Sequence, residues 1–144
     1  MTGHRITDQE KQTLITAALS ARDQAYMPYS HYAVGAALLT SEGNIIKGCN
    51  IENASYGVTN CAERTAFFKA VSEGERSFRA IAIAGGIAGE QPTDYAYPCG
   101  ICRQVMQEFG GSDFVIIAAK SPNDYKEFTL AELLPFGFGG ESIR

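Results

Sequence analysis

Hydrophobic and polar positions follow a helical period at the start of the chain. Thr7 and Glu10 have the spacing of a capping box, in which two side chains satisfy free amide groups of a helix N-terminus. Apolar residues then recur at intervals of three and four positions up to about Tyr26, two residues before Pro28. The pattern predicts a helix from about residue 7 to residue 26, whose apolar face covers a sheet.

The rest of the chain alternates between strand-like and helical patterns, as α/β proteins do. Strands are expected where short apolar runs alternate or are continuous, and helices where apolar residues form a stripe. A tight turn joins the first two strands as a hairpin. We therefore predict one domain, residues 1–144, with a three-layer α/β/α fold: a mixed five-stranded sheet with helices on both faces. The expected strands are 32–38, 45–49, 80–84, 114–119 and 125–129, the further helices 60–72, 100–109 and 131–135, and the longest loops 50–59 and 85–97.

Composition and charge are those of a globular protein and argue against two classes of partner. Of the 144 residues, 45% are hydrophobic and 19% are charged, and the net charge is −4. Lysine and arginine form no cluster, which argues against a nucleic-acid surface. No apolar run is long enough to span a membrane, and the polar start lacks the apolar segment of a signal peptide. We expect a cytoplasmic protein, in which cysteines are more often metal ligands than disulfides.

Two cysteine-containing stretches, each at the expected start of a helix, indicate a metal site. Residues 98–102 contain a Cys-x-x-Cys pair, Cys99 and Cys102, and residues 60–63 supply Cys61. Catalytic zinc sites use three protein ligands and keep one position for water, and three thiols match that requirement. A helix N-terminus also favours the thiolate form of cysteine. The spacing predicts one catalytic Zn²⁺ per chain.

Charged residues beside the cysteines have the chemistry that such a site needs. Glu63 is not required as a ligand and is available as an acid and base. Three thiolates and Zn²⁺ have a net charge of −1, which a positive side chain would offset. Arg64, three residues after Cys61, is the first candidate to donate hydrogen bonds to sulfur, and Arg103 is the second.

The cysteines also permit two other interpretations. A Cys-x-x-Cys pair alone is compatible with a redox pair or with half of a structural zinc site. With Cys49, four cysteines would close a structural zinc site and make the chain a binding module. That alternative predicts that Cys49 binds metal and that Glu63 is dispensable.

Four segments resemble the small homotetrameric cytidine deaminases of the zinc-dependent, three-cysteine type. Cys-Ala-Glu followed by Pro-Cys-x-x-Cys is a zinc deaminase signature, and the resemblance extends from about residue 7 to residue 138. It implies a cytidine-deaminase-like fold and a hydrolase that converts cytidine and 2′-deoxycytidine to uridine and 2′-deoxyuridine, releasing ammonia, in pyrimidine salvage. The matching segments are 29–37, 48–54, 61–66 and 98–104.

The resemblance also implies roles for individual residues. Cys61, Cys99 and Cys102 bind Zn²⁺, which lowers the pKa of a bound water. Glu63 takes a proton from that water, gives one to ring N3 of the pyrimidine and protonates the departing amine. The substrate-binding residues implied are Tyr32, Asn50, Glu52, Tyr56, Ala62 and Phe138.

Several of these substrate contacts carry further expectations. Asn50 and Glu52 bind the ribose hydroxyls, and because a carboxylate repels phosphate, a nucleoside is expected rather than a nucleotide. The backbone of Ala62 hydrogen-bonds the pyrimidine. Phe138, or Phe136 instead, is the tail aromatic that completes a neighbouring subunit's site, which implies a homotetramer with shared sites.

Two positions depart from the family pattern, and other deaminases remain alternatives. Tyr32 stands where the family usually has phenylalanine, and Tyr97 stands where serine is more usual. The nearest rival is a deaminase of an aminoacyl-nucleoside antibiotic, which Glu52 within Asn-x-Glu-Asn disfavours. A polynucleotide-editing deaminase is disfavoured by the acidic net charge.

Overall fold

The computed structural model describes residues 6–143. The expectation that the first residues do not form a signal peptide therefore lies outside the described part of the chain. Within residues 6–143, none of the helices combines the length and the apolar character needed to cross a membrane.

A five-stranded sheet forms the centre of the fold, with the strands in the order β2-β1-β3-β4-β5. The only parallel neighbours in this sheet are β3 and β4, and the other three pairings are antiparallel. The predicted mixed five-stranded sheet is thus confirmed. The strands are β1 (Tyr32–Thr40), β2 (Ile45–Cys49), β3 (Phe78–Ile87), β4 (Val115–Ser121) and β5 (Asp124–Thr129).

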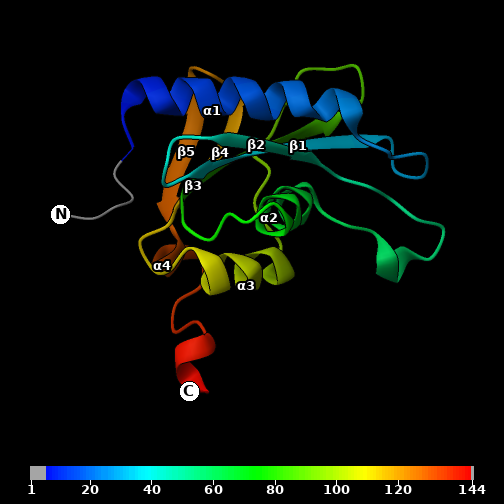
Figure 1. Cartoon of the computed structure of the whole chain (residues 1–144). Coiled ribbons are helices and arrows are strands. Elements are labelled where there is room, and N and C mark those ends of the chain that lie inside the picture. The colour runs from blue at the N-terminus through cyan, green and yellow to red at the C-terminus, as the bar shows by residue number, and fades with distance from the viewer. Residues whose placement is uncertain (1–5, 144) are drawn as a thin grey trace.

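Helices cover both faces of the sheet, as predicted (Figure 1). The first helix, α1, lies on one face, and α2 and α3 lie on the other. Beyond the short helix α4 the C-terminal tail extends away from the sheet (Figure 1). The α-helices are α1 (Asp8–Ala21), α2 (Ala62–Ser72), α3 (Gly100–Phe109) and α4 (Leu130–Leu133), and the 3₁₀ turns are η1 (Arg22–Gln24), η2 (Tyr56–Val58) and η3 (Gly140–Ser142).

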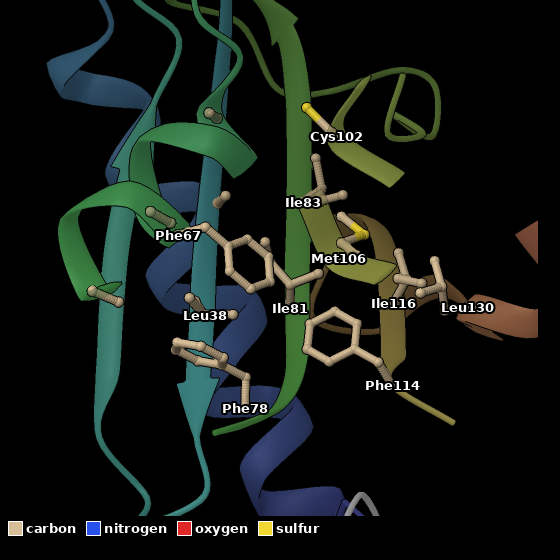
Figure 2. Close-up of a cluster of buried hydrophobic side chains, with 14 residues drawn as sticks. Leu38, Phe67, Phe78, Ile81, Ile83, Cys102, Met106, Phe114, Ile116 and Leu130 are labelled. Carbon is tan, nitrogen blue, oxygen red and sulfur yellow. The ribbon is translucent and has the colours of Figure 1, made fainter. Parts of the chain in front are cut away.

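The alternation of side chains along the strands creates a hydrophobic core on each face. In β1, Leu38 faces the α2 and α3 layer, whereas Leu39 faces α1. The core beneath α2 and α3 is built around Phe67, Phe78 and Phe114, all fully buried (Figure 2). Burying each of these rings contributes about 1.5–3 kcal/mol. This core fixes the two helices that begin with the cysteine-containing stretches.

The first helix begins where predicted but ends earlier. Thr7 and Glu10 form the expected capping box. The α-helix stops at Ala21 and tightens into η1, whereas the sequence predicted helix up to Tyr26. Tyr26 instead donates its amide to the Asn50 carbonyl (3.0 Å), and its own carbonyl accepts from the next loop. Its backbone partners are therefore supplied by another segment.

The third strand is longer than predicted. It extends through Gly85 and Gly86, which the sequence placed in a loop, and pairs with β1 as far as Tyr32 and Ile87. A side chain at position 85 would lie 3.1 Å from both Tyr32 and Ala96. Glycine is therefore favoured at position 85 because there is little room for a side chain, and it does not mark the end of the strand.

Candidate active site

The structure brings the sulfur atoms of Cys61, Cys99 and Cys102 together. All three lie within 4.8 Å of one another. The Cys61 and Cys99 sulfurs are 3.8 Å apart. Sulfurs that share a tetrahedral zinc ion lie about 3.8 Å apart, because Zn–S bonds are about 2.3 Å long. The donor set and its spacing therefore fit Zn²⁺.

Each cysteine owes its position to a helix start. Cys61 is the N-cap of α2 and Cys99 is the N-cap of α3, and their carbonyls accept the first helical hydrogen bonds, at 3.1 and 2.9 Å. Neither thiol caps its helix, so both sulfurs remain available to another partner. Cys102 is buried in the first turn of α3. Two helix N-termini thus point their positive ends at one thiol cluster.

Arg64 supplies a positive charge to this cluster. Its guanidinium donates a hydrogen bond to the Cys61 sulfur at 3.4 Å. Donation from the Cys102 thiol and from Arg64 holds the pKa of Cys61 below the usual thiol range, while the shared proton raises the pKa of Cys102. Arg103, the second candidate, donates to the Pro98 and Leu133 carbonyls instead and so anchors the start of α3.

Glu63 lies beside the thiols in a dry environment. Only 4% of the residue is exposed. Burial, and secondarily the nearby Cys61 thiolate, raises the pKa of Glu63 to about 7. A carboxyl group in such surroundings can both accept and release a proton near neutral pH.

A cavity of about 390 Å³ adjoins the cluster. Cys61, Cys99 and Glu63 line it, together with Tyr32, Asn50 and Ala62 from the predicted substrate-binding set. The cavity therefore unites six of the predicted site residues. Six lining residues were not proposed as substrate contacts from the sequence: Val34, Thr59, Asn60, Ile83, Ala96 and Tyr97. Of these six, only Tyr97 had been singled out in the sequence, as a departure from the family pattern, and Ile83 had only the apolar pattern of a buried strand.

Asn50 has structural hydrogen bonds within this cavity wall. Its side-chain oxygen accepts from the Val34 amide at 2.9 Å, and its side-chain nitrogen donates to the Tyr32 carbonyl at 2.8 Å. One further donor and one lone pair of the amide group remain for a ligand.

Glu52 and Tyr56 lie in an adjoining hollow rather than in the thiol cavity. They line a second cavity of about 400 Å³ with Tyr29, Ser30 and Thr59. Thr59 lines both cavities, so the two are neighbours. The rings of Tyr29 and Tyr56 meet edge to face at 6.2 Å.

The tail aromatics are remote from both cavities of the same chain. Phe138 is 57% exposed and Phe136 is fully exposed. The tail is attached to α3 by the Gln104 side chain, which donates to the Phe138 carbonyl at 2.7 Å.

Cys49 is not part of the thiol cluster found in the described residues. It lies at the end of β2, and partial burial raises its thiol pKa. The four-cysteine structural site that the sequence permitted is therefore not formed.

The chain is similar to known cytidine deaminases in sequence and in fold. A family model described as the cytidine and deoxycytidylate deaminase zinc-binding region matches residues 8–118. A cytidine deaminase of Sporosarcina psychrophila is 49% identical over 136 residues, which cover 94% of this chain and 95% of that protein. A cytidine deaminase of Halalkalibacterium halodurans is 49% identical over 134 residues, covering 93% and 98%. The crystal structure of cytidine deaminase from Burkholderia pseudomallei matches with a TM-score of 0.79 and 46% identity, covering 88% of this chain and 97% of that one.

Proposed function

The chain belongs to the cytidine and deoxycytidylate deaminase family, and from this we propose that it hydrolyses cytidine and 2′-deoxycytidine to uridine and 2′-deoxyuridine with release of ammonia. One observation carries the proposal: a cluster of three thiols and a buried carboxyl group adjoins a cavity of about 390 Å³, which Cys61, Cys99 and Glu63 line. A closed structural site would have no use for such a cavity.

Cys61, Cys99 and Cys102 would hold the zinc ion. When bound, the ion supplies the acidity that lets water act as a nucleophile near neutral pH. Glu63 is positioned to move the protons, because its carboxyl group is buried beside the thiols. A Glu63 carboxylate oxygen would accept one proton from the attacking water and deliver it to ring N3. It would then take the remaining proton of the hydroxyl group added at C4 and deliver it to the exocyclic amine, which leaves as ammonia while the C4 carbonyl forms.

The surrounding residues would bind the nucleoside. The backbone of Ala62, fully buried at the start of α2, is proposed to hydrogen-bond the pyrimidine beside Tyr32. Asn50 and Glu52 are proposed to bind the ribose hydroxyls, with Tyr56 lining the hollow beside them. A carboxylate at this place favours a nucleoside over a nucleotide, because it repels phosphate.

The proposal extends to the oligomeric state of the enzyme and to its place in the cell. We propose a homotetramer in which a tail aromatic, Phe138 or Phe136, completes a neighbour's site; both rings are exposed in the single chain. We also propose that the enzyme serves pyrimidine salvage in the cytoplasm, where reducing conditions keep the thiols available for metal.

The experiment compares the zinc-loaded chain with Glu63→Gln. Conversion of cytidine is followed by ultraviolet absorbance, and zinc content is measured for both proteins. Loss of the proton carrier should lower kcat about 10²- to 10⁴-fold while one zinc per chain is retained. The matched control is Glu73→Gln, an exposed glutamate at the other end of α2, which should leave kcat unchanged.

Two results would contradict the proposal. A zinc-loaded wild type that deaminates neither cytidine nor 2′-deoxycytidine would exclude the nucleoside reaction, and activity on an aminoacyl-nucleoside antibiotic would then identify the rival substrate. A fully active Glu63→Gln variant would instead refute only the role of Glu63.

A further inference from the structure

The carboxylate of Glu52 is held by a turn that precedes β1. Its Oε1 atom accepts the Tyr29 amide at 3.0 Å and the Ser30 amide at 3.2 Å. Its Oε2 atom accepts the Ser30 hydroxyl. Together these donors, the Ser30 hydroxyl foremost, lower the pKa of Glu52, so the group remains a carboxylate.

The direction of the Ser30 hydroxyl is determined by its second partner. The Tyr32 amide donates to Ser30 Oγ at 3.1 Å, so that oxygen accepts on one side. The single hydroxyl proton must then be donated to Glu52. Ser30 therefore connects the first residue of β1, which lines the thiol cavity, to the carboxylate in the adjoining hollow.

The turn that carries Ser30 is itself closed. The His31 amide donates to the Met27 carbonyl at 3.0 Å, and His31 has a left-handed backbone with φ of 60°. A non-glycine residue adopts that conformation only when its surroundings fix it. Glu52 is thus oriented by a defined loop and not by a flexible one.

The three donors leave Glu52 with little remaining capacity. A carboxylate has about four acceptor positions, two on each oxygen. Both positions on Oε1 and one on Oε2 are occupied. A single position on Oε2 is left, and it adjoins the Ser30 hydroxyl in the 400 Å³ hollow.

We propose that Ser30 is a positioning residue that fixes the rotation of the Glu52 carboxylate, so that its one free acceptor position receives a single 2′- or 3′-hydroxyl of the substrate. This inference rests on the proposed nucleoside deamination. Without the serine hydroxyl, two amides still hold Oε1, but Oε2 has no protein partner and turns to water.

The test compares Ser30→Thr with Ser30→Val, two side chains of the same shape that differ in the hydroxyl. Steady-state kinetics are measured on cytidine and on 2′,3′-dideoxycytidine, which lacks the 2′- and 3′-hydroxyls and keeps the 5′-hydroxyl. A lost hydrogen bond to a charged group corresponds to about a tenfold effect. We expect Ser30→Val to raise KM for cytidine about tenfold with kcat within about twofold, Ser30→Thr to restore KM, and neither to change KM for the dideoxynucleoside.

Two controls separate positioning from general damage. Ser41→Val alters a serine in the turn between β1 and β2, remote from both cavities, and should leave KM unchanged. In a Glu52→Gln background, Ser30→Val should add little, because residues that act through one another are not additive.

The inference and the proposed function fail in different ways. A wild type inactive on cytidine refutes the proposed function. An active wild type whose Ser30→Val variant binds cytidine normally, or is equally impaired on both nucleosides, refutes the role of Ser30. If Ser30→Val does not fold, a Ser30→Thr variant with a raised KM for the dideoxynucleoside as well as for cytidine likewise refutes it.

Discussion

The contacts of Arg64 indicate that the thiol cluster carries negative charge. Its guanidinium donates to the Cys61 sulfur, and its Nε atom is buried without a hydrogen-bond partner among the described residues. A guanidinium whose Nε atom is buried without a partner is stabilised by a negative neighbour. Sulfurs that carry negative charge, as metal ligands do, would supply that neighbour.

We predict that Arg64→Gln weakens zinc binding about 10- to 100-fold, the usual effect of removing a group that hydrogen-bonds a metal ligand. The measurement is zinc retention against a competing chelator, read independently of activity. Arg76→Gln, which removes the same charge from an arginine that donates to the Val71 carbonyl, is the control and should retain zinc normally. Equal zinc retention by both variants would show that Arg64 does not act on the thiolates.

The residues of the site were predictable to the extent that their chemistry depends on type and spacing. Three thiols and Glu63 could be recognised because their type, order and spacing match a zinc deaminase signature, and the structure places them together. Ser30 could not be recognised. Its importance depends on the Met27–His31 turn and on contact with a residue 22 positions away, neither of which has a local sequence pattern.

Two glycines set how closely the helices approach the sheet. A Cβ atom on Gly35 would lie 2.0 Å from the Ala18 carbonyl oxygen in α1, and one on Gly48 would lie 2.5 Å from the Ala66 amide nitrogen in α2. Gly35 and Gly48 thus allow close approach of a helix backbone to the sheet, on opposite faces of it. Of these two helices, α2 is the one that begins at Cys61 and contains Glu63.

We predict that Gly35→Ala and Gly48→Ala each lower the free energy of unfolding by about 3 kcal/mol, because a core atom is added where there is no room. Gly48→Ala should also lower kcat/KM per folded molecule, since it displaces the helix that carries Glu63. Urea unfolding and kinetics at a temperature where both variants remain folded give the two quantities. An equal loss of kcat/KM in Gly35→Ala and Gly48→Ala would contradict the expectation that activity depends on the position of α2.

The start of α1 links element stability to pH. Glu10 accepts the Thr7 amide at 3.0 Å and two Arg79 nitrogens at 2.7 to 3.0 Å. The Thr7 amide, with Arg79, lowers the pKa of Glu10 from its ordinary 4.5. Because the folded pKa is the lower one, the stabilisation is complete well above pH 4.5 and is lost as the pH falls through the folded pKa.

We predict that Glu10→Gln lowers the free energy of unfolding by about 1–2 kcal/mol at about pH 7, from the weakened cap and the lost ion pair. The difference from wild type should shrink at about pH 3, where the wild-type carboxylate is itself becoming protonated. Urea titrations at both pH values measure it, with Glu42→Gln in the β1–β2 turn as the control. A difference of the same size at both pH values would contradict the electrostatic account.

Element types were predictable, but their ends were not. Periodicity identified every strand, and α3 has the predicted bounds. The errors lie where a distant segment supplies the hydrogen bonds, as Asn50 does for Tyr26 and β1 does for Gly85 and Gly86. Local pattern carries no information about such partners, because they are separated by more than twenty residues.

At the scale of the whole molecule, the single chain leaves several large apolar side chains on its surface. Exposed aromatic side chains occur in the loop beside the site and in the tail, where Tyr56, Phe136 and Phe138 are 76%, 104% and 57% exposed. The tail backbone is nevertheless fixed to α3 through Gln104. A ring held in place without contacts in its own cavity is suited to contact another chain.

We predict that light scattering coupled to size exclusion gives the mass of four chains, and that Phe138→Ala raises KM for cytidine about tenfold through the lost aromatic contact. Phe136→Ala serves as the matched variant, and a larger effect there would assign the role to that ring.

A co-expression experiment tests whether the tail acts on a neighbouring chain. If it does, co-expressed Glu63→Gln and Phe138→Ala chains form mixed assemblies in which a site with intact Glu63 receives an intact Phe138. Their activity at low cytidine concentration should then exceed that of either variant alone. A fully active monomer, or mixed assemblies no better than the parent variants, would contradict the shared site, because a tail acting within its own chain cannot be supplied by another.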